Sequence, residues 1–236
     1  MVFGYNRSMG EKTLHQQLKA IYAVQGGQTE TRLHGYQIDV QTPERLIEIQ
    51  TRNFGALRPK LDALLPEYPL RVVYPIARQK WLVKENAAGE LVDRRRSPRR
   101  GRWEHLFQQL VHLPSYLRHP NFSLEVLLVD VEELRRDDGQ GSWRRGGWSI
   151  CDRRILTIVE QRLFTLPADL LVFLPENLVE PFSTRQLAKA GQIPPRLAYQ
   201  MLYTLRALDL VVQAGQHVRT RLFTHQLPPV SAGRPG

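Results

Sequence analysis

Residues 35–50 read GYQIDVQTPERLIEIQ, and this stretch decides the fold. Two of its segments alternate apolar and polar side chains, and each carries one acidic residue, Asp39 or Glu48, between aliphatic neighbours. A period of two is typical of a β-strand with one buried face, and the Thr-Pro-Glu between the segments is a turn signal. The pattern therefore predicts two antiparallel strands, 36–41 and 45–51, with both carboxylates on one polar face.

The elements on either side of this pair complete an α/β core. Apolar residues recur at helical spacing in 11–24 and again in 53–65, where Pro66 ends the pattern. Residues 29–33 predict a further strand before the pair, and 70–75 predict a buried strand after it. The expected order is helix, three strands, helix and strand.

The middle of the chain is expected to be less regular. Residues 84–102 combine glycine, proline and six arginines, which predicts a basic loop. A helix over 103–117 and a strand over 124–131 follow, and 135–147 predict a second loop rich in Arg, Asp and Gly. From about Arg154 the chain is expected to become mainly helical.

The C-terminal part predicts helices followed by a hairpin, the order of a winged helix. The expected elements are helices at 166–174 and 183–190, a third helix from Pro194 or Pro195, and strands at 210–213 and 218–223 around a turn at 214–216. We therefore expect a domain at 1–150, a winged-helix-like domain at 151–225 and a flexible tail at 226–236.

The composition indicates a polyanionic partner and excludes several classes of protein. Lys and Arg number 33 against 23 Asp and Glu, a formal charge of +10 that favours binding to phosphates. The single cysteine, Cys151, excludes an internal disulfide and a multi-cysteine zinc site. No apolar run is long enough to cross a bilayer, and no glycine-rich nucleotide-binding motif occurs. We expect a cytoplasmic protein without a membrane partner.

The two acidic residues of the strand pair are the sharpest chemical signal. Carboxylates that share one face can hold Mg²⁺ or Mn²⁺, whose bound water attacks phosphodiesters. Asp39 and Glu48 are therefore the candidate metal ligands, and Glu11 or Glu30 could supply a further ligand. The simpler alternative is that both carboxylates lie on a half-exposed sheet and meet only water.

This order of elements, with Asp39 on the second strand and Glu48-x-Gln50 on the third, resembles the PD-(D/E)XK nuclease superfamily over about residues 11–76. The resemblance implies a restriction-endonuclease-like αβββαβ core in which Asp39 and Glu48 bind the metal ion. In that family a lysine usually stands where this chain has Gln50, and helps to activate water. The departure removes a positive charge, which Lys60 or Lys80 could replace. Gln50 would then orient the water, and Glu11 would serve as an auxiliary ligand.

The candidate contacts to nucleic acid are basic or aromatic side chains from three parts of the chain. A winged helix inserts its third helix into the major groove and lays its hairpin on the backbone, and arginine suits phosphate. The candidates are Arg52, Arg94, Arg95, Arg96, Arg99, Arg100, Arg102, Arg196, Tyr199, Gln200, Arg206, Arg219 and Arg221.

The sequence thus predicts an Mg²⁺-dependent (or Mn²⁺-dependent) DNA endonuclease or a nuclease-like DNA-processing protein. The alternative is a non-catalytic DNA-binding regulator or adaptor with a degenerate nuclease core, and a third is an interaction module for an acidic protein. RNA as the partner, a homodimer, and membership of a larger defence or repair assembly remain open.

Overall fold

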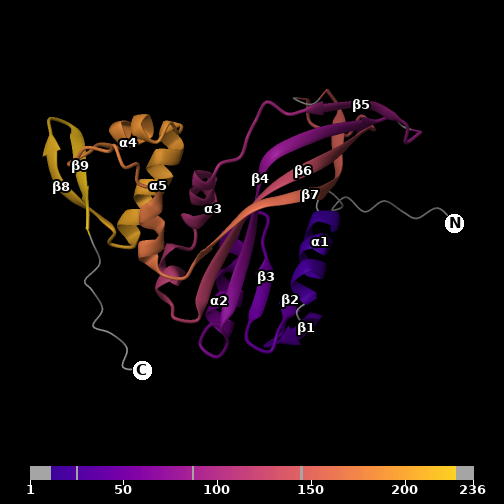
Figure 1. Cartoon of the computed structure of the whole chain (residues 1–236), viewed down its shortest axis with the longest axis horizontal. Coiled ribbons are helices and arrows are strands. Elements are labelled where there is room, and N and C mark those ends of the chain that lie inside the picture. Colours follow the sequence, from indigo (N-terminus) through magenta and orange to yellow (C-terminus); the bar gives the residue numbers. More distant parts are fainter. Residues whose placement is uncertain (1–11, 25, 87, 144–145, 227–236) are drawn as a thin grey trace. The chain divides into compact units, whose positions relative to one another are not determined.

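The computed structural model describes residues 12–24, 26–86, 88–143 and 146–226, which form a mixed α/β fold (Figure 1). Two compact units divide the chain: 1–51, 71–103 and 125–162 belong to unit 1, and 52–70, 104–124 and 163–236 to unit 2. The helices are α1 (Lys12–Ala23), α2 (Arg58–Leu64), α3 (Phe107–Leu110), α4 (Thr184–Ala190) and α5 (Pro195–Ala207). The strands are β1 (Gln28–Leu33), β2 (Tyr36–Gln41), β3 (Leu46–Ile49), β4 (Leu70–Glu85), β5 (Leu91–Arg96), β6 (Phe122–Asp137), β7 (Trp148–Phe164), β8 (Val211–His217) and β9 (Thr220–His225).

A seven-stranded sheet is the main element of unit 1. Its strand order is β1-β2-β3-β4-β6-β7, and β5 pairs with β4 off this path. Antiparallel pairing sets Thr29 opposite Val40 and Val40 opposite Ile47, and the side chains of Val40 and Ile47 both belong to the buried core. The predicted strands over 36–41 and 45–51 are confirmed, as is the order helix, three strands, helix and strand.

Helix α1 packs on one face of this sheet, next to β1, β2 and β3 (Figure 1). Leu14 and Leu18 lie one helical turn apart and are buried against Val40, Ile47 and Ile49. Burying one such side chain is worth about 1.5–3 kcal/mol, so this apolar stripe fixes the helix on the sheet.

Two strands are much longer than the sequence predicts, and a third was not predicted. β4 continues past residue 75 to Glu85, and β6 covers more than the expected 124–131. The predicted helical character from Arg154 is wrong over 154–164, because β7 runs to Phe164 and pairs with β6. The β-branched residues Ile155 and Ile158 of this strand pack against the α1 core. The expected boundary at residue 150 falls inside β7.

The predicted basic loop at 84–102 is also wrong in part, since 91–96 form strand β5. Arg94 and Arg96 pair with Val83 and Trp81 of β4, so backbone hydrogen bonding orders a segment whose composition indicated a loop. The helix expected over 103–117 is broken into the 3₁₀ turns Trp103–Leu106 and Pro114–Arg118 around α3. Proline cannot continue a helix, which accounts for the second break.

Unit 2 ends with two helices followed by a hairpin. Ser183 caps α4 by accepting a hydrogen bond from the backbone N of Gln186, as its sequence position predicts, and α5 begins at Pro195. The expected first helix, 166–174, is a 3₁₀ segment, Pro167–Phe173. A bridge pairs Phe182 with Phe223 of β9. The assignment of these elements as a winged helix stays a prediction.

The hairpin turn lies elsewhere than the sequence predicts. The expected turn at 214–216 is wrong, because Gly215 belongs to β8 at a shift of register. His217 pairs with Thr220, so the chain reverses at Val218 and Arg219, where Val218 has a φ of 56°. Within the described residues no helix is long and apolar enough to span a bilayer. Most of the predicted tail, 227–236, is outside the described residues.

Candidate functional site

Asp39 is held on three sides. Its side chain is buried, and its Oδ2 accepts a hydrogen bond of 2.9 Å from the backbone N of Ile49. Two side chains of α1 complete the surroundings: His15 Nε2 lies 3.1 Å from Oδ2, and Lys19 Nζ lies 2.9 Å from Oδ1. Both carboxylate oxygens are therefore engaged by the protein itself.

These contacts shift the ionisation of the pair in opposite directions. Burial by itself would raise the pKa of Asp39, but the hydrogen bonds from His15, Ile49 and Lys19 outweigh it, and the pKa is lowered. Burial likewise would lower the pKa of Lys19, but Asp39 and Glu30 outweigh it, and the pKa is raised. Both groups are thus stabilised in their charged forms.

Glu48 lies on the neighbouring strand. Its side chain is buried, and strand alternation places it on the face of β3 opposite Ile47 and Ile49, which pack against α1. The same alternation places Asp39, which precedes Val40, on that face of β2 as well, although its carboxylate reaches His15 and Lys19 of α1. In the described part of the chain, no group of three or more His, Cys, Asp or Glu side chains is arranged to hold a metal ion. The shared cation of Asp39 and Glu48 stays a prediction.

The other predicted catalytic residues are spread over the chain. The backbone N of Gln50 donates to Val73 O on β4, and Glu30 binds Lys19 at 3.3 Å. Lys60 lies on α2, in unit 2, and Glu11 lies outside the described residues. Lys80 lies on β4, where its Nζ is 3.6 Å from Glu133 Oε2.

Sequence reasoning missed His15 and Lys19 as neighbours of Asp39. The signal was available, because the two residues are spaced by four and so share one face of a helix. A helix that packs on the strand pair through Leu14 and Leu18 presents this adjacent polar face beside the sheet.

A second feature of unit 1, which we call the arginine face, surrounds Trp81. It consists of Trp81, Arg78, Arg94, Arg96, Arg100, Arg154 and the carboxylates Asp130 and Glu132. The guanidinium carbons of Arg94 and Arg96 lie 4.4 and 5.0 Å from the centre of the Trp81 ring. Such stacking attracts the cation to the ring and holds it in place.

The carboxylates of the arginine face anchor its cations. Asp130 accepts two hydrogen bonds from Arg78, at 2.9 and 2.6 Å, and Glu132 lies between Arg94, at 2.9 Å, and Arg154, at 2.6 Å. Both carboxylates are therefore ion-paired with arginines of other strands. The set holds five arginines and two carboxylates, a net charge of +3. Four of its members, Arg78, Arg96, Arg100 and Asp130, line a cavity of about 320 Å³ together with Trp81.

The remaining predicted arginines of this region lie in different surroundings. Arg95, between Arg94 and Arg96, lies 3.6 Å from Asp93. Arg99 donates its backbone N–H to Ser97 Oγ at 3.3 Å. Arg52 is exposed just after β3, and Arg102 is exposed beyond β5.

Unit 2 has a basic cavity of its own, about 320 Å³, between α5, the start of α4 and β9. Its lining brings together the predicted Tyr199, Arg206, Arg219 and Arg221, with Arg206 5.4 Å from the Phe223 ring. The predicted Arg196 and Gln200 lie on α5 but do not line it, whereas Arg185 of α4 does and was missed.

Comparison with known proteins places the chain in a family without assigning it an activity. The profile of a domain of unknown function, DUF8091, matches residues 12–165. The chain belongs to the DUF8091 family. An uncharacterised protein of Treponema pallidum (strain Nichols) is 30% identical over 222 residues, which cover 92% of this chain and 86% of that protein. No solved structure matches. The DUF8091 domain begins at α1 and ends directly after β7, so it contains Asp39, Glu48 and the arginine face.

Proposed function

We propose that this protein binds DNA and that the arginine face of unit 1 is a binding surface. The observation that carries the proposal is the stacking of Arg94 and Arg96 on Trp81, beside a cavity that Arg78 and Arg100 also line. Guanidinium groups fork onto phosphate oxygens, and each phosphate neutralised releases condensed counterions.

The anchoring of these arginines favours a binding surface over a merely solvated one. A mobile surface arginine loses side-chain entropy when it binds a phosphate. Here the ring of Trp81 and the carboxylates of Asp130 and Glu132 already hold the side chains. The net charge of +3 of the arginine face leaves positive charge for an anionic partner after these internal pairs.

The salt dependence of binding tests this proposal. Fluorescence anisotropy would measure the affinity for a short DNA duplex at several salt concentrations, and a parallel series would use single-stranded DNA and RNA. For Arg94→Ala plus Arg96→Ala, we expect weaker binding and a slope of log K against log salt that is smaller by about two.

Arg95→Ala is the matched control, because Arg95 lies on the same strand but contacts Asp93. Arg95→Ala should change the salt slope by less than Arg94→Ala or Arg96→Ala changes it alone. A double variant that binds with the slope of the unaltered protein would exclude the arginine face as the binding surface.

A second candidate function is metal-dependent phosphodiester hydrolysis at Asp39 and Glu48. The observation that favours it is the hydrogen bond from the backbone N of Ile49 to Asp39 Oδ2, which brings this carboxylate to the residue next to Glu48. Both residues are only 8% exposed, so the two carboxylates are largely shielded from water. Their oxygens are of the type that Mg²⁺ or Mn²⁺ prefers, and the ion would supply an activated water.

Cleavage assays separate this candidate from a non-catalytic role. Supercoiled, linear and branched DNA would be incubated with the protein and Mg²⁺ or Mn²⁺, with EDTA as a control. Hydrolysis is expected to disappear in Asp39→Asn plus Glu48→Gln. Cleavage that survives in this variant would reject the site. Binding without cleavage under either metal would support the regulator or adaptor alternative.

A further inference from the structure

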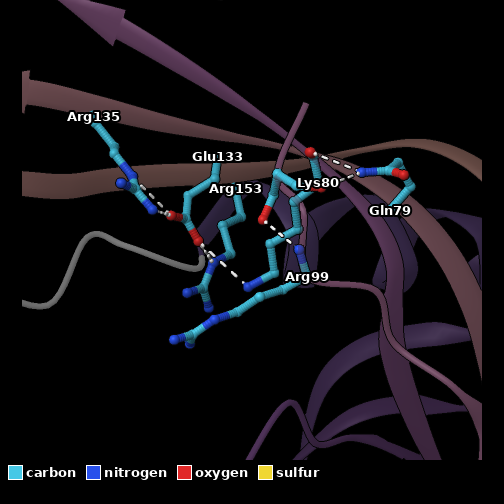
Figure 2. Close-up of polar contacts among 7 residues, drawn as sticks. Gln79, Lys80, Arg99, Glu133, Arg135 and Arg153 are labelled. Carbon is cyan, nitrogen blue, oxygen red and sulfur yellow. Dashed lines mark hydrogen bonds and ion pairs between the residues drawn. The ribbon is translucent and has the colours of Figure 1, made fainter. Parts of the chain in front are cut away.

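The cations of unit 1 gather around carboxylates. Glu133, whose side chain is 2% exposed, accepts hydrogen bonds from Arg135 at 3.0 and 2.6 Å and from Arg153 at 3.1 Å. Lys80 Nζ lies 3.6 Å from the same carboxylate, and Figure 2 shows the three basic side chains converging on it. In this cluster, as in the arginine face, acidic side chains of the protein compensate part of the positive charge.

The basic cavity of unit 2 has a different composition. The described residues that line it include four arginines, Arg185, Arg206, Arg219 and Arg221, and no aspartate or glutamate. The four arginines give the lining a formal charge of +4, and all of them are exposed. Positive charge that gathers in a concave surface without acidic neighbours attracts polyanions such as nucleic acids.

Helix α5 adds two tyrosines to this cavity. Tyr199, Tyr203 and Arg206 are spaced by four and three residues, so they share one face of the helix. Tyr199 is 64% exposed and Tyr203 is 50% exposed, and both line the cavity. Nucleobases of any identity stack on accessible aromatic rings, because every base has a π-face. The cavity thus combines stacking surfaces with cations, which is the pairing that single-stranded nucleic acid needs.

Packing fixes the wall of the cavity around Phe223. This residue is buried, and its backbone exchanges two hydrogen bonds of 2.8 Å with that of Phe182, which directly precedes the cap of α4. The guanidinium carbon of Arg206 lies 5.4 Å from the centre of the Phe223 ring. Arg221 is two residues before Phe223 on β9, so both lie on the same face of the strand. A site whose elements are already held loses less conformational entropy when it binds a ligand.

We propose that this cavity binds an unpaired nucleotide of a nucleic-acid strand, with the base stacked on Tyr199 or Tyr203 and the phosphates held by the surrounding arginines. Its volume of about 320 Å³ lies at the lower end of the range of small-ligand sites, so it admits one nucleotide but not a duplex. The bases of a duplex show only their edges in the grooves and offer a tyrosine ring no face to stack on. Arginine suits the phosphates, because its guanidinium forks onto their oxygens.

The nucleotide site goes beyond the DNA binding that we propose for the arginine face. The cavity is built from residues 183–223 of unit 2, whereas the arginine face belongs to unit 1. The two sites also need different features of the ligand, since the arginine face requires only phosphates and the cavity requires an unstacked base. Either site can therefore fail without the other.

Fluorescence anisotropy of the full chain with labelled oligonucleotides of one sequence tests the nucleotide site. The probes are single-stranded DNA, single-stranded RNA and duplex DNA. For Tyr199→Ala plus Tyr203→Ala, we expect the affinity for single strands to fall about tenfold or more, and the affinity for the duplex to stay unchanged. Tyr199→Phe plus Tyr203→Phe keeps both rings and should retain single-strand binding.

The salt dependence of single-strand binding measures the contribution of the arginines. Arg185→Gln plus Arg221→Gln should reduce the slope of log K against log salt by about 1.4, since each phosphate contact with a single strand adds about 0.7. Lys189→Gln is the matched control, because Lys189 is exposed on α4, like Arg185, but does not line the cavity. This control should keep the slope of the unaltered protein.

Two comparisons separate the nucleotide site from the arginine face and identify the strand. In a protein that carries Arg94→Ala plus Arg96→Ala, the tyrosine-to-alanine changes should weaken single-strand binding by the same factor as before. Tighter binding of DNA than of RNA would assign the site to a DNA strand, the reverse to RNA, and equal binding to the base and phosphate chemistry that both share. The site is overturned if no single strand binds, if the alanine variant binds single strands as tightly as the unaltered protein, or if that variant loses duplex binding to the same extent.

Discussion

Lys19→Met perturbs the ion pair that engages Asp39. Methionine keeps most of the apolar stem of Lys19 and removes the ammonium. The ion pair is largely buried, since the side chain of Lys19 is 13% exposed and that of Asp39 is 12% exposed. The carboxylate would keep its contacts with the backbone N of Ile49 and with His15. It therefore loses one charge-assisted hydrogen bond, which is worth about 1.5–3 kcal/mol. Leaving a buried charge without any partner costs about 3–5 kcal/mol, and this value sets the upper bound.

We expect the free energy of unfolding of Lys19→Met to fall by about 2 kcal/mol in urea denaturation. Glu30→Gln is the control, since it removes the charge of the other partner of Lys19. The side chain of Glu30 is 63% exposed. An exposed pair of this kind is worth less than about 1 kcal/mol. A double-mutant cycle with Asp39→Asn isolates the coupling between the two residues. If Lys19→Met loses no more stability than Glu30→Gln, the view that this pair holds α1 on the sheet is refuted.

Three further results are expected. Because the pKa of Asp39 is lowered from 3.8, its contribution to stability is full above that value and is lost as the pH falls through the lowered pKa; Asp39→Asn should flatten acid denaturation curves in this range. Gly101→Ala should lower the free energy of unfolding by about 1–3 kcal/mol, since a Cβ there would lie 2.4 Å from Ala77 O. Gly55→Ala is the control, because the nearest atom to a Cβ at Gly55 is 3.8 Å away, and thermal unfolding should show little change. Ser183→Ala should cost about 1 kcal/mol by removing the cap of α4, and Ser183→Asp should recover most of it; equal melting temperatures of all three proteins would contradict the capping role.

The elements that could be predicted from sequence are those with a regular local pattern. The alternation around Asp39 and Glu48 predicted β2 and β3, and the helical pattern that begins at Ser183 predicted the start of α4. The long continuations of β4 and β7 could not be predicted, because partners far along the chain stabilise them. Arg94 to Arg96 read as a loop on composition, yet the ladder with Trp81 and Val83 orders them as a strand.

The candidate sites show the same division. Residue types and net charge indicated that arginines and carboxylates carry the chemistry of the candidate sites. They did not indicate which of these side chains contact one another. The partners of Asp39 on α1 and the three cations around Glu133 come from elements that tertiary packing brings together. Only an argument that places α1 on the strand pair and pairs β6 with β4 and β7 could have found them.

The two adjacent acids of β6 also lock the register of the sheet. A slip of β6 by one residue would turn Val129 and Val131 out of the core and exchange the positions of Glu132 and Glu133. Lys80 and Arg153 would then lose Glu133 as their counterion, and Arg94 would lose Glu132 on the other face of the sheet. Misaligned pairing is thus penalised twice, by hydrophobic exposure and by charge, so one strand enforces its own alignment between its neighbours.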